Sequence, residues 1–87
     1  VEPGLSIEEN ILETINIYPN PTANVLYIKS NVISNYHLYN MFGQKIISGQ
    51  INEGDNELNL RQYSNGIYFI QINTSTTFTI KKIIIAK

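Results

Sequence analysis

From Ile15 onward, apolar and polar residues alternate along the chain with a period of two. In residues 67–73, Tyr68, Ile70 and Ile72 share one parity, while the other parity mixes apolar residues with Gln71 and Asn73. Successive side chains of a strand point to opposite faces, so the pattern predicts a half-buried strand. We expect the tyrosine and the two isoleucines on its core side.

Turn residues divide this pattern into seven short segments. Strands are predicted at residues 15–18, 25–29, 36–40, 45–51, 56–60, 67–73 and 77–87. The connections between them are too short for the crossovers that parallel pairing requires. The sequence therefore predicts an all-β fold, a single antiparallel sandwich of about seven strands.

Two of the turns have a clear local cause. Pro19 and Pro21, on either side of Asn20, stop the first strand because proline has no N–H to donate to a ladder. Residues 41–44 form a hairpin turn in which Gly43 is the residue best able to adopt a positive φ.

The last segment is unusually apolar for the end of a chain, which normally frays, so we expect it to be tied down or held by a partner at a sheet edge. Phe78 and Ile80 have one parity, and Ile83 and Ile85 the other. The apolar face thus changes sides across Lys81-Lys82. Either a β-bulge lies there, or the tail leaves the sheet after Lys82.

Residues 1–14 differ from the rest. They contain a Pro-Gly turn, and Ser6 with Glu9 resembles a helix capping box. A helix this short is marginal in water, so a linker is the better interpretation. The absence of an initiating Met indicates a piece excised from a longer polypeptide. The ordered domain is expected to span residues 15–87.

Composition limits the classes of partner. The 87 residues carry a net charge of −1, which offers no field for collecting phosphates, so nucleic acid is not expected as a partner. No cysteine is present, and the longest apolar run, residues 83–86, is far too short to insert in a membrane as a helix. The charges are nevertheless separated, with glutamates near the start and lysines near the end.

Candidate catalytic and metal-binding residues are few. His37 is the single histidine, and no serine lies in a G-x-S-x-G pattern. Glu53, Asp55 and Glu57 surround Gly54 but match no calcium-loop spacing. We expect no enzyme activity, metal or cofactor. The six tyrosines leave a second class open, a carbohydrate- or protein-binding accessory module of a secreted enzyme, although the chain has no tryptophan.

Four motifs in order resemble a known family. They are Tyr18-Pro19-Asn20-Pro21-Thr22, the hairpin from Leu38 to Gln44, the stretch that ends Asn65-Gly66-Ile67-Tyr68, and the lysine-rich apolar end. Together they resemble the C-terminal sorting domain, type A, of the type IX (Por) secretion system. The similarity runs from about Ile15 to Lys87. Asn40 stands where this family more often has Asp, and it preserves the turn chemistry.

The resemblance implies an immunoglobulin-like sandwich at the end of a larger cargo protein. It implies passage through the periplasm, recognition by the translocon and its shuttle protein, and export to the cell surface or medium. A sortase-like peptidase then usually removes the domain. The family's terminal motif falls on Lys81, Lys82, Ile83, Ile84, Ile85 and Lys87, and its Gly-x-Tyr motif on Gly66 and Tyr68.

The residues suggest a mechanism for the tail. An unpaired edge strand offers a row of backbone groups that a partner can extend. On this hypothesis Ile83 and Ile85 anchor the partner, Lys82 and Lys87 fix its register by charge, Gly66 supplies backbone geometry, and Tyr68 packs beneath the last strand.

Overall fold

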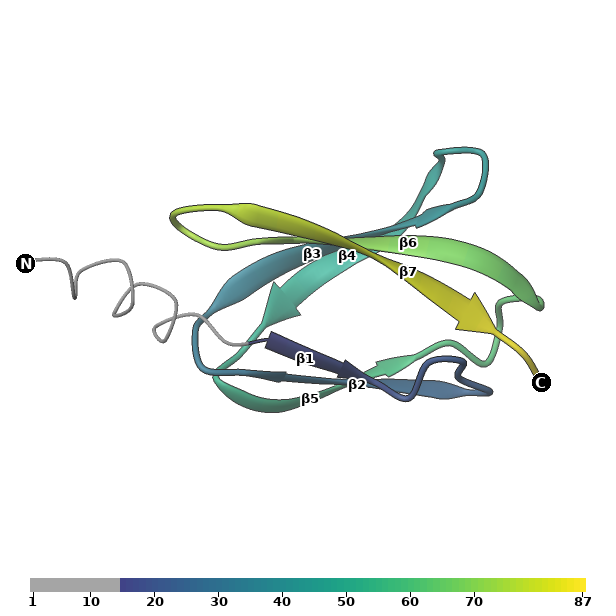
Figure 1. The fold of residues 1–87 in the computed structure, drawn as a ribbon, viewed down its shortest axis with the longest axis horizontal. Helices are drawn as coiled ribbons and strands as arrows, with labels where there is room; N and C mark the ends of the chain where they lie inside the picture. Colours follow the sequence, from purple (N-terminus) through teal and green to yellow (C-terminus); the bar gives the residue numbers. More distant parts are fainter. Residues whose placement is uncertain (1–14) are drawn as a thin grey trace, which may run out of the picture.

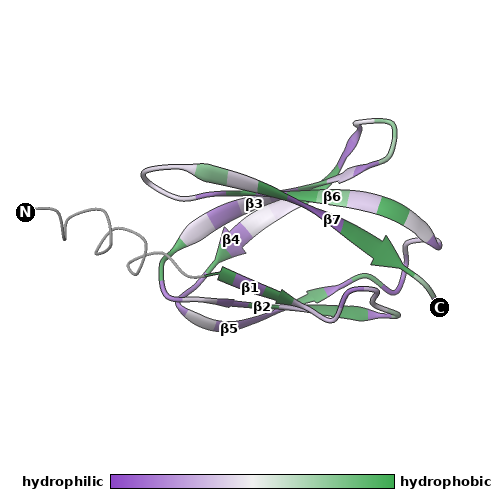
Figure 2. Ribbon diagram, in the orientation of Figure 1, coloured by the Kyte–Doolittle hydropathy of each residue, from purple (hydrophilic) through white to green (hydrophobic). Residues whose placement is uncertain are grey.

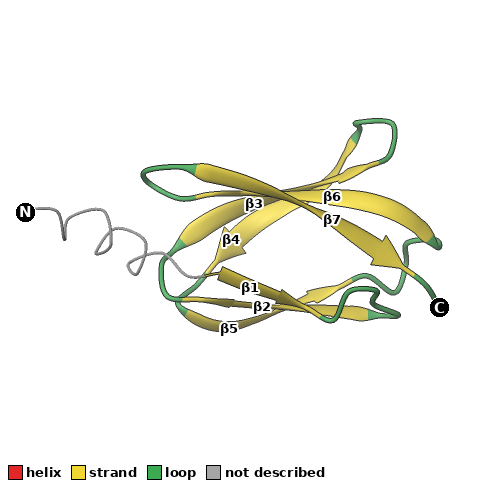
Figure 3. Ribbon diagram, viewed as in Figure 1, coloured by secondary structure: helices red, strands yellow, loops and turns green. Residues whose placement is uncertain are grey.

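The computed structural model describes residues 15–87, and all regular structure within this range is strand (Figure 3). The seven strands are β1 (Ile15–Tyr18), β2 (Val25–Ser30), β3 (Ser34–Asn40), β4 (Lys45–Ile51), β5 (Gly54–Asn59), β6 (Gly66–Asn73) and β7 (Phe78–Ile85). Every strand predicted from the sequence is present, with ends within two residues of the prediction. Residues 1–14, predicted to be a linker with a short helix as the alternative, lie outside the described residues.

The strands form two antiparallel sheets packed face to face (Figure 1). One sheet has the order β1-β2-β5 and the other β4-β3-β6-β7. The hydroxyl of Tyr68, at the start of β6, donates a hydrogen bond to the carbonyl of Ser64 at 2.8 Å. This link is the tyrosine corner of immunoglobulin-like sandwiches. The predicted fold class is confirmed.

The core lies between the sheets. The expected face of β6 is confirmed, because Tyr68, Ile70 and Ile72 are all buried. The full set of buried apolar side chains is Leu26, Ile28, Leu38, Ile51, Leu58, Leu60, Tyr68, Ile70, Ile72, Ile83 and Ile85. Burial of each aliphatic side chain contributes about 1.5–3 kcal/mol. With no disulfide to help, this packing is the main stabilising term.

β7 corrects one expectation from the sequence. Its pairing with β6 keeps a single register from Asn73↔Phe78 to Gly66↔Ile85. The strand therefore has no bulge at Lys81-Lys82, and it does not leave the sheet there. Ile83 and Ile85 face the core, whereas Phe78 and Ile80 lie on the outer face and are 60% and 56% exposed.

The change of parity at Lys81-Lys82 therefore comes from the placing of apolar residues along β7, and the backbone of the strand is regular. In Figure 2, β7 is green towards both ends and purple in the middle, where the lysines lie. The first half of the strand presents its apolar side chains outward, and the second half presents them to the core.

A bulge occurs instead beside the β3–β4 turn. Leu38 pairs with Ile47 but Tyr39 pairs with Lys45, which leaves Ile46 as the extra residue. The turn itself is as predicted, because Gly43 has φ +83°. The side-chain oxygen of Asn40 accepts hydrogen bonds from the N–H groups of Phe42 and Gln44, at 2.9 and 3.0 Å. Asn40 therefore closes the turn as an aspartate would.

The two halves of β7 should respond differently to truncation of the same residue type. Ile83→Ala removes a fully buried side chain and should lower the free energy of unfolding by about 2–5 kcal/mol. Ile80→Ala, three residues earlier and on the outer face, should change it by less than about 0.5 kcal/mol. Urea unfolding followed by circular dichroism measures both. Equal losses would contradict the register described here.

Candidate functional site

The Tyr-Pro-Asn-Pro-Thr motif in the β1–β2 connection lies against the outer edge of β7. The side chain of Asn20 makes two hydrogen bonds there. Its Nδ2 donates to the carbonyl of Lys82 at 2.8 Å, and its Oδ1 accepts from the N–H of Ile84 at 3.0 Å. One amide group thus satisfies an acceptor and a donor that the edge of the sheet would otherwise expose.

The backbone of Thr22 continues this contact. Its N–H donates to the carbonyl of Ile84, and its carbonyl accepts from the N–H of Ala86, each at 2.9 Å. Thr22 and Ile85 form a parallel bridge, and Thr22 is 1% exposed. We call Asn20 and Thr22, with the β7 backbone that they bind, the edge clamp.

The motif's other residues frame the edge clamp. Pro19 and Pro21 flank Asn20, and each follows a cis peptide bond. Neither proline has an N–H that would need a partner at this edge. Tyr18 precedes them as the last residue of β1. The proline-rich motif thus stops one strand and covers the edge of another.

The opposite side of the tail is held by the start of β6. The N–H of Lys87 donates to Oδ1 of Asn65 at 3.0 Å, and Gly66 pairs with Ile85. The Lys87 ammonium donates to the carbonyl of Arg61 at 2.6 Å. The end of the chain is therefore held by its own fold from both sides.

Gly66 and Tyr68 support this end of the sandwich. Gly66 has φ +155°, a conformation that side-chain-bearing residues rarely adopt, which fits the part in backbone geometry predicted for it. Tyr68 is the cross-strand neighbour of Ile83 and is 7% exposed, so it packs in the core beside the last strand of the same sheet. The centroid of its ring lies 6.4 Å from that of Tyr63.

Burial raises the pKa of Tyr36, a partly buried tyrosine packed against the core, above its ordinary value of 10.0, and Tyr63 adds to that shift.

The predicted recognition residues fall into two groups. Lys81, Lys82 and Lys87 are exposed, and Ile84 is partly exposed. Ile83 and Ile85 are buried at 0% and 1% exposure. The hypothesis that these two isoleucines anchor a partner does not fit the folded domain, because the domain's own core encloses them.

Consecutive lysines on β7 point to opposite sides of the sheet. Lys82 pairs with Phe69 on the outer face, whereas Lys81 pairs with the buried Ile70 on the inner side. Lys81 lines a groove there with Ile15 and Ile72.

The idea that a partner strand extends the edge of β7 is also limited by the structure. The edge clamp already occupies the backbone groups from Lys82 to Ala86. Among the described residues, no strand pairs with the outer edge before Lys82. Only the first half of β7 leaves room for such an extension.

The tyrosines considered for carbohydrate binding and the acidic residues considered for metal binding are not part of the edge clamp. Tyr18 stacks on Tyr27 on the outer face of the three-stranded sheet, with ring centroids 5.7 Å apart, beside a groove lined by Asp55 and Glu57. Within residues 15–87, no group of three His, Cys, Asp or Glu side chains could hold a metal ion. The same range holds no helix that could cross a membrane.

The fold and the clamped edge define an immunoglobulin-like sandwich whose terminal strand is held by two motifs that are far apart in the sequence. Residues 16–86 match the secretion system C-terminal sorting domain, and the chain belongs to this family. It is accordingly a C-terminal sorting signal of type IX secretion, which directs a cargo protein to the cell surface or the extracellular space. The family is one of sorting domains and not of catalysts.

Beta-agarase A of Zobellia galactanivorans is a sequence relative of this chain. It is 27% identical to this chain over 77 residues, which cover 85% of the chain and 14% of the agarase. The chain thus spans much less than two thirds of this relative's length.

The edge clamp predicts a specific effect of removing the Asn20 side chain. Asn20→Ala leaves a donor and an acceptor of β7 without a protein partner and should lower the free energy of unfolding by about 1–3 kcal/mol. Hydrogen exchange at the Ile84 amide should accelerate more than at core amides. Asn16→Ala, at an exposed position of β1, is the matched control and should change neither quantity. Unchanged exchange at Ile84 in Asn20→Ala would contradict the clamp.

Proposed function

We propose that the export machinery recognises the folded domain through the exposed side chains of its C-terminal strand. Lys81, Lys82, Ile84 and Lys87 are the residues that would meet a partner. Ile83 and Ile85 contribute indirectly, because their burial fixes the position of the strand. Recognition would thus depend on tertiary structure as well as on the terminal residues themselves.

The partners in this proposal are the type IX translocon, its shuttle protein and a sortase-like peptidase. The domain would meet them in the periplasm, with the cargo domain attached on its N-terminal side. Residues 1–14 would act as the linker to that cargo, and the peptidase would cut there or upstream. The sorting function of the family supports this proposal.

The observation that carries the proposal is the convergence of the sequence motifs on one strand. Asn20 and Thr22 bind the backbone of β7 from one side. Asn65 and Gly66 bind it from the other. Motifs that lie more than forty residues apart in the chain therefore hold the same short segment in one conformation.

The structure also shows which experiment is informative. Deleting residues 83–87 would remove two core side chains and most of the edge clamp. Such a truncation is expected to unfold, so its export defect would not separate recognition from stability. Substitutions of the exposed lysines leave the core intact, because neither Lys82 nor Lys87 is part of it. Lys87→Gln also removes the hydrogen bond to the Arg61 carbonyl, so thermal unfolding of the purified variant must show that it still folds.

The test is a fusion of a signal peptide, a fluorescent reporter and residues 1–87, expressed in a cell with a type IX system. The wild-type fusion should reach the surface or medium. The double variant Lys82→Gln, Lys87→Gln should remain in the periplasm at least about tenfold more, a difference equivalent to about 1.4 kcal/mol in recognition. Lys29→Gln, on the other sheet, is the control and should be exported normally. Full export of the double variant would refute recognition through these lysines.

A further inference from the structure

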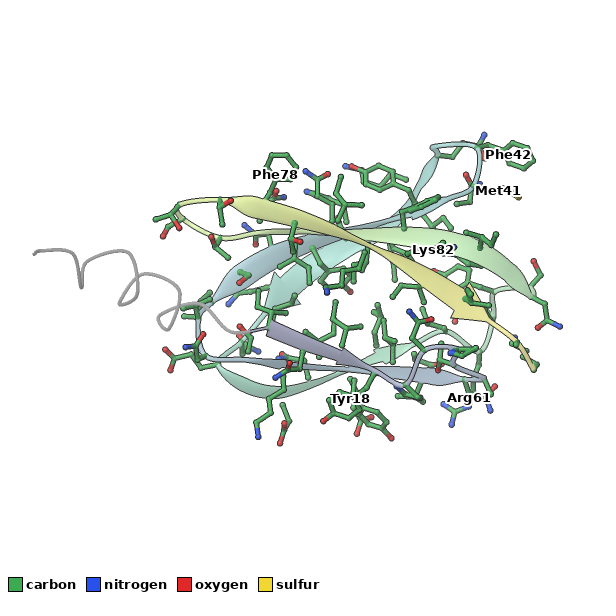
Figure 4. All side chains as sticks on the ribbon, in the orientation of Figure 1. Tyr18, Met41, Phe42, Arg61, Phe78 and Lys82 are labelled. Carbon is green, nitrogen blue, oxygen red and sulfur yellow. The ribbon has the colours of Figure 1, made fainter. Side chains whose placement is uncertain are left out.

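Several large apolar side chains are exposed on the outer side of the four-stranded sheet and in its β3–β4 turn. Phe78, Ile80, Met41 and Phe42 are 60%, 56%, 61% and 81% exposed. Figure 4 shows Phe78, Met41 and Phe42 on the side of the molecule away from the three-stranded sheet, and Tyr18 on the opposite side. A patch of exposed apolar side chains on so small a domain is typical of an interaction site.

The strand register gathers part of this patch into a groove. Tyr39, Phe69 and Lys82 form one row across β3, β6 and β7. Ile80 lies in the next row, opposite Gln71. The result is a groove of about 340 Å³ lined mainly by Tyr39, Met41, Phe69 and Ile80, which we call the apolar groove.

The charges around the apolar groove have one sign. Lys45, opposite Tyr39, and Lys82, opposite Phe69, lie on the face that carries the groove, and residues 34–52 and 66–87, which build this sheet and its hairpins, contain no aspartate or glutamate. The acidic residues of the described chain, Glu53, Asp55 and Glu57, lie in the β4–β5 turn and on β5 of the other sheet. A partner with acidic side chains around an apolar centre would be attracted to the groove, and a basic partner would be repelled.

We propose that the apolar groove is a docking surface for a protein of the export machinery that presents an apolar side chain surrounded by carboxylates. This inference rests on the function proposed above and adds a second surface to the terminal strand. Lys82, on the outer face of β7, belongs to both surfaces and links them. A protein fits better than a lipid surface because only two lysines, Lys45 and Lys82, lie on this face, whereas binding to anionic lipid typically uses clusters of about four to eight basic residues.

The test substitutes Ile80 with charges of both signs in the reporter fusion. Ile80→Glu places a carboxylate among the partner's acidic groups and should reduce export at least about tenfold. Ile80→Lys removes the same apolar contact but keeps the favourable sign, so it should reduce export about threefold or less. Ile33→Glu is the matched control, because Ile33 is an isoleucine of similar exposure outside the groove, 62% against 56%. It should be exported normally.

Thermal unfolding of each purified variant confirms that it folds, which the exposure of both isoleucines favours. Equal defects for Ile80→Glu and Ile80→Lys would overturn the acidic partner, and normal export of Ile80→Glu would overturn the groove as a docking surface. Neither result would affect the sorting function itself, which fails only if the wild-type fusion stays in the periplasm. Vesicles of phosphatidylglycerol supply the remaining arm. If the wild-type domain binds these vesicles and Ile80→Glu does not, the groove binds a lipid surface and the proposal is overturned.

Discussion

The backbone hydrogen-bonding groups on the open edge of β7 impose the constraint on which the rest of the structure depends. An edge strand leaves alternate N–H and C=O groups without partners, and such an edge is prone to pair with other chains. Here the β1–β2 connection supplies those partners with one side-chain amide and one backbone residue. The end of the domain is ordered because both sides of its last strand are bonded.

This arrangement divides the work of β7 between alternate residues. Ile83 and Ile85 pack in the core, while Lys82 and Ile84 point to the outer face. Where the edge clamp ends, Lys81 projects to the inner side of the edge. An inward-pointing charge at an exposed edge discourages pairing with a second sheet. The same short segment thus stabilises the core, exposes side chains to a partner and discourages aggregation.

The sequence predicted the strands and the core face of β6 because a period of two maps directly onto the two faces of a sheet. It predicted the glycine turn at residue 43 from local chemistry alone. It did not place the bulge correctly. Parity shows that two apolar sets of β7 face opposite ways, but it cannot show that Phe78 and Ile80 stay exposed on the outer face of a regular strand. Nor could it pair Asn20 with β7, because a single amide carries no local signal of a partner more than sixty residues away.

The distance along the chain between the two halves of the edge clamp has a consequence for biosynthesis. The bonds from Asn20 to Lys82 and Ile84 join residues 62 and 64 positions apart, so they form only after nearly the whole domain has been translated. A polypeptide that ends before Lys82 would lack the backbone groups to which Asn20 in the proline-rich loop hydrogen-bonds. Because the outer edge of the terminal strand is held in place only when that loop has its partners, a cell could export complete polypeptides and retain truncated ones.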